Sequence, residues 1–129
     1  MRNASLSLAL VALLAVQACK PSVQLPVRTG FIAVPVSVDQ LVCHVRAIAA
    51  EQQLDFHFST FENDQGPKAT MRLVGQSFEL DMVRWDRRQQ YEIRSYDMSK
   101  DASGREAASR AFDRLRASLV PRLQAVCRE

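Results

Sequence analysis

Residues 69–98, ATMRLVGQSFELDMVRWDRRQQYEIRSYDM, decide the fold. Apolar and polar side chains alternate along three segments of this stretch, which Gly75-Gln76 and the loop 86–89 separate. Antiparallel strands with one buried face produce this alternation, so we expect three strands in a meander. Residues 55–61 alternate in the same way and add a fourth strand, joined through the turn-forming NDQGP of 63–67.

The register of the two later hairpins follows from matching apolar with apolar side chains and opposite charges with each other. The first hairpin is expected to turn at Gly75-Gln76, because a two-residue type II′ turn prefers glycine at its first central position. The expected pairs are Leu73 with Phe78, Met71 with Leu80, Ala69 with Met82 and Arg72 with Glu79, then Met82 with Ile93 and Asp81 with Arg94. A slip of one residue would turn every apolar side chain to the wrong face.

Helical periodicity flanks the strands on both sides. Ser37–Gln40 has the spacing of a capping box, and the helix that it starts should run to about Leu54. Ser103–Glu106 has the same spacing and should start a C-terminal helix, in which Pro121 is expected to cause a kink.

The short apolar run at 31–36, FIAVPV, is expected to be an edge strand or an extended lead-in to the first helix. The resulting fold class is α+β. It is an antiparallel four-stranded meander, possibly with a fifth edge strand, and an N-terminal and a C-terminal helix pack on one face of it.

The N-terminus has the three parts of a secretory signal. A positive start at Met1-Arg2 precedes the uncharged segment 4–16, and the small residue Ala18 lies just before Cys19. The uncharged segment is shorter than the roughly 20 residues that a transmembrane helix needs. We therefore expect a cleaved signal peptide over residues 1–18.

Val16-Gln17-Ala18-Cys19 resembles the lipobox of bacterial lipoproteins. The resemblance implies cleavage before Cys19 and attachment of a diacylglycerol, with acyl chains such as palmitate, to its sulfur. Gln17 departs from the pattern, in which this position is more often small, so cleavage after Ala18 without lipid is the alternative. Lys20, in place of an aspartate associated with inner-membrane retention, implies an outer-membrane lipoprotein that faces the periplasm.

Residues 19–30 would then consist of the lipidated Cys19 and an extended tether after it, in which Pro21 and Pro26 disfavour helix. Residues 31–129 are long enough for one compact α+β domain. The formal net charge of +3 mixes 17 basic with 14 acidic residues, which excludes the concentrated basic surface of a nucleic-acid-binding protein.

The chain has three cysteines, an odd number for an exported protein. If Cys19 carries lipid, Cys43 and Cys127 are left to form a disulfide in the oxidising periplasm. Two buried free thiols are the alternative.

No residue pattern indicates catalysis, a metal or a cofactor. His44 and His57 do not have metal-ligand spacing, and both are expected at the surface. The chain has no phosphate-binding loop, no nucleophile elbow and no HExxH sequence. We therefore expect a protein that is not an enzyme.

The segment VRWDRRQQY at 83–91 gathers residue types that are enriched at protein interfaces. A partner-binding site is expected at the hairpin end and on the outward face of the sheet. Its residues would be Trp85, Arg87, Arg88, Arg84, Tyr96, Arg94 and Arg72. A solvated sheet face with paired charges, or a site for an anionic small ligand, would fit the same residues.

The sequence therefore suggests a small periplasm-facing lipoprotein that binds another protein. In design it resembles immunity lipoproteins, which neutralise toxins, although no motif in residues 31–129 marks a family. An accessory lipoprotein of an envelope machine, similar to a pilotin, is the alternative, and a cell-wall enzyme is a third reading. A protruding loop would favour an inhibitor, whereas a groove or an exposed strand edge would favour an accessory protein.

Overall fold

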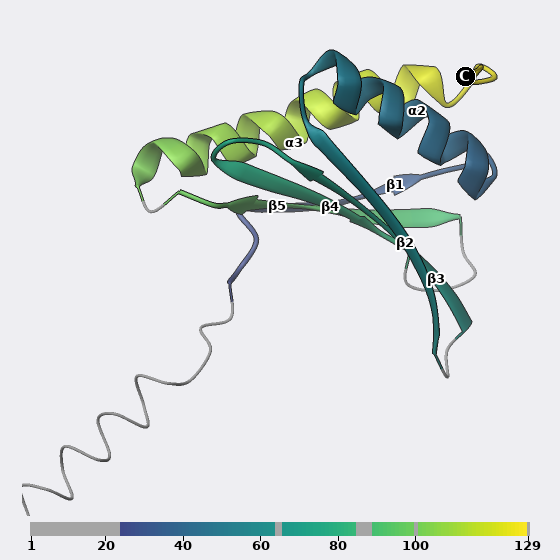
Figure 1. The fold of residues 1–129 in the computed structure, drawn as a ribbon, viewed down its shortest axis with the longest axis horizontal. Helices are drawn as coiled ribbons and strands as arrows, with labels where there is room; N and C mark the ends of the chain where they lie inside the picture. Colours follow the sequence, from purple (N-terminus) through teal and green to yellow (C-terminus); the bar gives the residue numbers. More distant parts are fainter. Residues whose placement is uncertain (1–23, 64–65, 85–88, 100, 129) are drawn as a thin grey trace, which may run out of the picture.

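A computed structural model of the chain describes residues 24–63, 66–84, 89–99 and 101–128. In this part of the chain a five-stranded sheet carries two helices on one face (Figure 1). The elements are β1 (Arg28–Ala33), α2 (Val38–Glu51), β2 (Asp55–Asn63), β3 (Gly66–Val74), β4 (Phe78–Val83), β5 (Gln90–Asp97) and α3 (Ala102–Arg122).

The strand order in the sheet is β1-β5-β4-β3-β2, and every neighbouring pair is antiparallel. Strands β2 to β5 are the expected meander, and β1 is the fifth edge strand, so the predicted α+β fold is confirmed. Strand β1 begins at Arg28, and residues 28–30 of the expected tether are therefore part of the sheet.

The register of the β4–β5 hairpin is as predicted, with Met82 opposite Ile93 and Asp81 opposite Arg94. The register predicted for β3 and β4 is wrong by two residues. Leu73 pairs with Leu80, not with Phe78, and the other predicted partners shift in the same way, as Met71 with Met82 and Arg72 with Asp81. Because side chains alternate with a period of two, this shift moves no side chain to the other face.

The position of Gly75 explains the shift. Its backbone N–H donates to the carbonyl of Phe78 at 3.0 Å, so Gln76 and Ser77 occupy the centre of the turn. A Cβ atom added at Gly75 would lie 2.6 Å from the ring of Phe78. Glycine is therefore required here to leave room for that ring, and not as the first central residue of the turn.

The core lies between the sheet and the two helices. Alternate residues of the strands point toward the helices and meet the apolar faces of α2 and α3. The largest fully buried side chains are Phe112, Leu41, Ile48, Met71, Leu73, Leu80, Met82, Ile93, Leu115, Leu119, Val34 and Val45. Burying such side chains provides most of the driving force for folding.

Helix α2 begins as predicted, because the hydroxyl of Ser37 accepts a hydrogen bond from the backbone N–H of Gln40 at 3.2 Å. It ends at Glu51 and not at Leu54, since Gln53 has a left-handed φ of 58° that turns the chain toward β2. Residues with φ in this region commonly end helices.

The predicted start of the second helix at Ser103 is wrong. Asp101 caps α3, because its carboxylate accepts hydrogen bonds from the backbone N–H groups of Ser103 and Gly104. At the other end Pro121 is the penultimate residue of the helix, so α3 ends just beyond it.

The segment after α3 is held against α2 by three kinds of contact. The disulfide Cys43–Cys127 is present, as predicted. The side chain of Gln40 accepts from the backbone N–H of Cys127 at 2.7 Å and donates to its carbonyl at 3.4 Å. The ring of His44 donates to the carbonyl of Ala125 at 2.9 Å, so His44 is buried, not at the surface as expected.

The disulfide is expected to contribute about 4 kcal/mol to the free energy of unfolding, because its partners are 84 residues apart. The double variant Cys43→Ser and Cys127→Ser should therefore lower the urea midpoint strongly. A thiol titration of the Cys19→Ala chain, denatured without reductant, should find no free thiol. Two reactive thiols in that titration would refute the disulfide.

Candidate functional site

The face of the sheet that points away from α2 and α3, called the outer face below, is not covered by any segment that the structure describes (Figure 1). Its side chains are the alternate residues of the strands that do not enter the core. They include Phe31 on β1, Glu92, Arg94 and Tyr96 on β5, Glu79, Asp81 and Val83 on β4, Arg72 on β3 and His57 on β2.

One row of paired residues crosses this face from edge to edge. Thr29 lies opposite Arg94, Arg94 opposite Asp81, Asp81 opposite Arg72, and Arg72 opposite His57. Directly opposite residues on one face are within reach of each other, so charges of alternating sign are held side by side.

The acidic residues of the outer face are more buried than the basic ones. Arg72 contacts Glu79 at 3.6 Å, and Arg94 contacts Glu92 on its own strand. The side chain of Glu79 is 19% exposed and that of Arg72 is 51% exposed. The guanidinium groups therefore reach farther toward solvent than the carboxylates that they neutralise.

Asp81 lies at the centre of this arrangement. Burial, followed by repulsion from Glu79, raises the pKa of Asp81 from 3.8 to about 6, although Arg72 and Arg94 lower it. Among the described residues its buried Oδ1 atom has no hydrogen-bond partner. Burial at this position thus disfavours the charged form of Asp81.

The structure brings together three of the seven residues predicted for partner binding. Arg72, Arg94 and Tyr96 lie on the outer face. Arg84 follows Val83 and belongs to the opposite face, beside Tyr91. Burial raises the pKa of Tyr91, and the charge of Arg84 partly offsets this increase. Trp85, Arg87 and Arg88 lie outside the described residues, and so does the predicted lipidation site Cys19.

The β2–β3 hairpin was predicted from the sequence, but its extension beyond the rest of the sheet was not. Strand β3 pairs with β2 along its whole length, from Gly66 to Val74, but with β4 only from Thr70 to Val74. The far end of the hairpin therefore extends beyond β4 as a two-stranded ribbon, which Figure 1 shows reaching past the rest of the sheet. The only sequence signal for this extension was the length of the alternating segment 55–61, and β2 continues beyond that segment to Asn63.

The loop that joins β4 to β5 leaves the sheet at this same end, since Val83 pairs with Thr70 on one side and with Glu92 on the other. The segment predicted to bind a partner is therefore connected to the part of the sheet from which the hairpin extends.

In the part of the chain that the structure describes, no group of three or more His, Cys, Asp or Glu residues could hold a metal ion. No helix there is both long and apolar enough to cross a bilayer. Comparisons of the chain with models of protein families, with curated proteins and with solved structures found no match.

Asp81→Asn is expected to stabilise the fold at pH 7.5 by about 1 kcal/mol after allowance for solvent screening. Because the pKa of Asp81 is higher in the folded than in the unfolded state, the folded state takes up a proton between about pH 4 and pH 6. The charged carboxylate thus lowers stability above pH 6, and the gain of the variant should vanish near pH 4.

Urea unfolding of both proteins at the two pH values measures this difference. Asp55→Asn is the matched control, because Asp55 is an exposed carboxylate on the same face and should respond little at either pH. A gain from Asp81→Asn that is equal at pH 4 and pH 7.5 would contradict the role assigned to its charge.

Proposed function

We propose that the protein is a lipoprotein of the bacterial envelope, anchored through Cys19 and facing the periplasm, which binds another protein without catalysis. The role that fits best is that of an inhibitor or immunity-type lipoprotein. A lipid anchor on Cys19, outer-membrane location and the partner are all parts of this proposal.

The observation that carries the proposal is the uncovered outer face. A sheet face that one domain leaves open, with Arg72, Arg94 and Tyr96 on a rigid set of paired strands, offers a pre-organised surface for a partner. Arginine and tyrosine are among the residues that contribute most at interface hot spots. The paired backbone that carries these side chains is already ordered and loses little conformational entropy on binding, which favours affinity.

The extended β2–β3 hairpin supports an inhibitor in particular. A two-stranded ribbon that reaches past the sheet can enter a cleft of another protein, which a flat face cannot do. The proposed contact with a toxin or enzyme would then combine the hairpin, the β4–β5 loop and the neighbouring part of the outer face.

An accessory lipoprotein of an envelope machine is the second candidate. The observation that favours it is the edge strand β1, whose outward side no described segment pairs with. Such an edge can accept a strand from an assembling subunit.

Competition between cells of the native host tests the first role. Cells that lack the gene should be killed by neighbouring parental cells and should grow normally when alone. The wild-type gene should restore survival, whereas Arg72→Ala with Tyr96→Ala, and Trp85→Ala with Arg87→Ala, should reduce it at least tenfold. Arg105→Ala, at an exposed position of α3, is the matched control and should restore survival fully.

Each variant must first show an unchanged melting temperature, so that lost protection reflects lost binding. Equal survival of the deletion strain beside its parent would overturn the immunity role. A growth or assembly defect of the deletion strain in pure culture would point to the accessory role instead.

The anchor is tested by the intact mass of the protein purified from its native host. We expect removal of residues 1–18 and a lipid-sized mass increment that disappears in Cys19→Ala. Cleavage without an added mass would mean that the protein is released into the periplasm with Cys19 as a free thiol beside the disulfide. The anchor part of the proposal would then be wrong, while partner binding could still be tested in the competition assay.

A further inference from the structure

Strand β1 is an edge of the sheet whose outward backbone groups have no partner among the described residues. The backbone N–H of Val34 donates to the carbonyl of Gln89 at 2.7 Å, and the register pairs Ile32 with Tyr91 and Gly30 with Ile93. Because hydrogen-bonded and non-hydrogen-bonded pairs alternate in antiparallel strands, the backbone N–H and C=O groups of Thr29, Phe31 and Ala33 point away from β5. These are the groups to which another strand binds.

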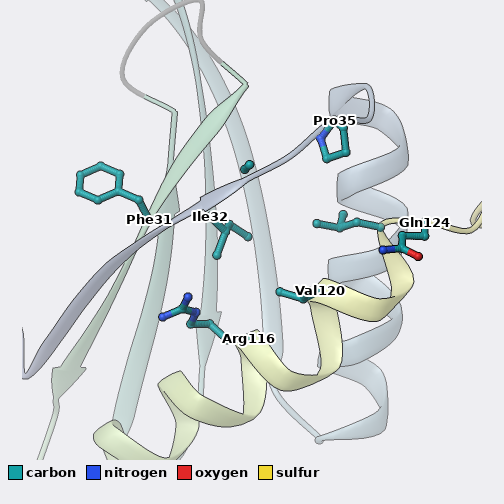
Figure 2. Close-up of a pocket in the computed structure, with 8 residues that line it drawn as sticks. Phe31, Ile32, Pro35, Arg116, Val120 and Gln124 are labelled. Atoms are coloured by element: carbon teal, nitrogen blue, oxygen red, sulfur yellow. The ribbon is translucent and has the colours of Figure 1, made fainter.

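A groove of about 390 Å³ lies between this edge and the C-terminal half of α3. It is lined by Phe31, Ile32, Ala33, Pro35, Arg116, Val120, Leu123 and Gln124. Figure 2 shows Ile32 pointing from the strand toward the helix, Arg116 and Val120 pointing from the helix toward the strand, and Phe31 on the other side of the sheet. Phe31 is 57% exposed and Val120 is 49% exposed, so apolar surface lies on both sides of the β1 edge.

Arg116 is the charged residue of the groove. It contacts the ring of Phe112, with its Cζ atom 5.8 Å from the centroid, and has no carboxylate partner in the described part of the chain. On the same helix Arg110 pairs with Glu106 and Arg122 pairs with Glu51. The groove thus combines an apolar lining with an unneutralised positive charge.

The order of these groups along β1 sets the pattern of a ligand. A Cβ atom added at Gly30 would lie 3.6 Å from Nη1 of Arg116, whereas Leu123 and Gln124 line the groove together with Pro35, farther along the chain. Arg116 and Val120 are one helical turn apart, about 6 Å. Residues two apart on a strand, which share a face, are separated by about 7 Å.

We propose that β1 and this groove bind an extended segment of a partner protein as a sixth strand, with an acidic side chain at Arg116 and an aliphatic side chain two residues away over Val120 and Leu123. The main chain of the segment would pair with Thr29, Phe31 and Ala33. This site rests on the second candidate role, for which it specifies the ligand. It does not use Arg72 or Tyr96, so it and the proposed contact at the outer face can fail independently.

Two other occupants fit the charge less well. The chain before β1 has no acidic residue, so its own N-terminal segment offers no carboxylate to Arg116. A second copy that joins β1 to β1 around a two-fold axis near Phe31 would place two Arg116 side chains in the same groove region, where like charges repel. A segment of another protein that carries an acid avoids both problems.

The test selects binders from a library of random ten-residue peptides displayed on phage, with the full chain in mild detergent as target. The selected peptides should be enriched in an acidic and an aliphatic residue two positions apart. Binding of one such synthetic peptide should slow amide hydrogen exchange at Thr29, Phe31 and Ala33. Its Glu→Lys counterpart should bind at least tenfold more weakly.

Two variants separate the backbone and charge contributions. Ala33→Pro removes an outward N–H group while sparing the bonds to β5, and should weaken the peptide at least tenfold. Arg116→Glu does not alter the sheet, and should reverse the preference between the Glu and Lys peptides. Arg105→Glu is the matched control, because Arg105 is exposed at the opposite end of α3, and should leave both affinities unchanged.

A library that yields no such pattern, or selected peptides that are insensitive to Arg116→Glu, would overturn the proposal. So would a dimer that forms in the absence of peptide and is broken by Ala33→Pro, since the edge would then be occupied by a second copy. If Ala33→Pro proves unstable, the charge reversal at Arg116 decides the question by itself.

Discussion

The structure depends on the burial of one face of an antiparallel sheet under two helices. Strands alternate their side chains with a period of two, so a sheet that buries Met71, Leu80 and Ile93 must present the residues between them to the other side. Helices α2 and α3 cover the apolar face, and the disulfide Cys43–Cys127 fixes the segment after α3 against α2. Among the described residues, both helices lie on one face of the sheet, and the outer face is therefore left uncovered.

The outer face accommodates its charges by pairing them across strands. Asp81 lies between Arg72 and Arg94, and the neighbouring acids Glu79 and Glu92 each contact one of the two arginines. The raised pKa of Asp81 shows that this neutralisation is incomplete, because burial outweighs the two arginines. Charged groups that are paired in this way tolerate contact with water, and under the proposed function they would exchange this pairing for contacts with a partner.

The two proposed binding surfaces use different physics. At the outer face, side chains on paired strands would supply specificity, and the extended β2–β3 hairpin would supply shape. At the β1 edge, backbone hydrogen bonds would supply most of the affinity, while Arg116 and the apolar groove would select the peptide. An inhibitor needs only the first surface, whereas an accessory lipoprotein that handles an extended segment needs the second.

The sequence by itself determined the local features: which segments alternate, the cap at Ser37 and the face of each strand. The cysteine number also suggested the pairing of Cys43 with Cys127, which the structure shows. These follow from periodicity and composition, which need no knowledge of distant contacts. Only the tertiary structure decided the two-residue register of β3 and β4, because the ring of Phe78 must lie over Gly75. It also decided that Asp101 caps α3, that His44 is buried, and that β1 borders a groove with Arg116. The burial of His44 and the groove at β1 result from residues far apart in the chain, which local periodicity does not encode. The cap at Asp101 is local, but the capping-box spacing at Ser103 pointed to a different residue.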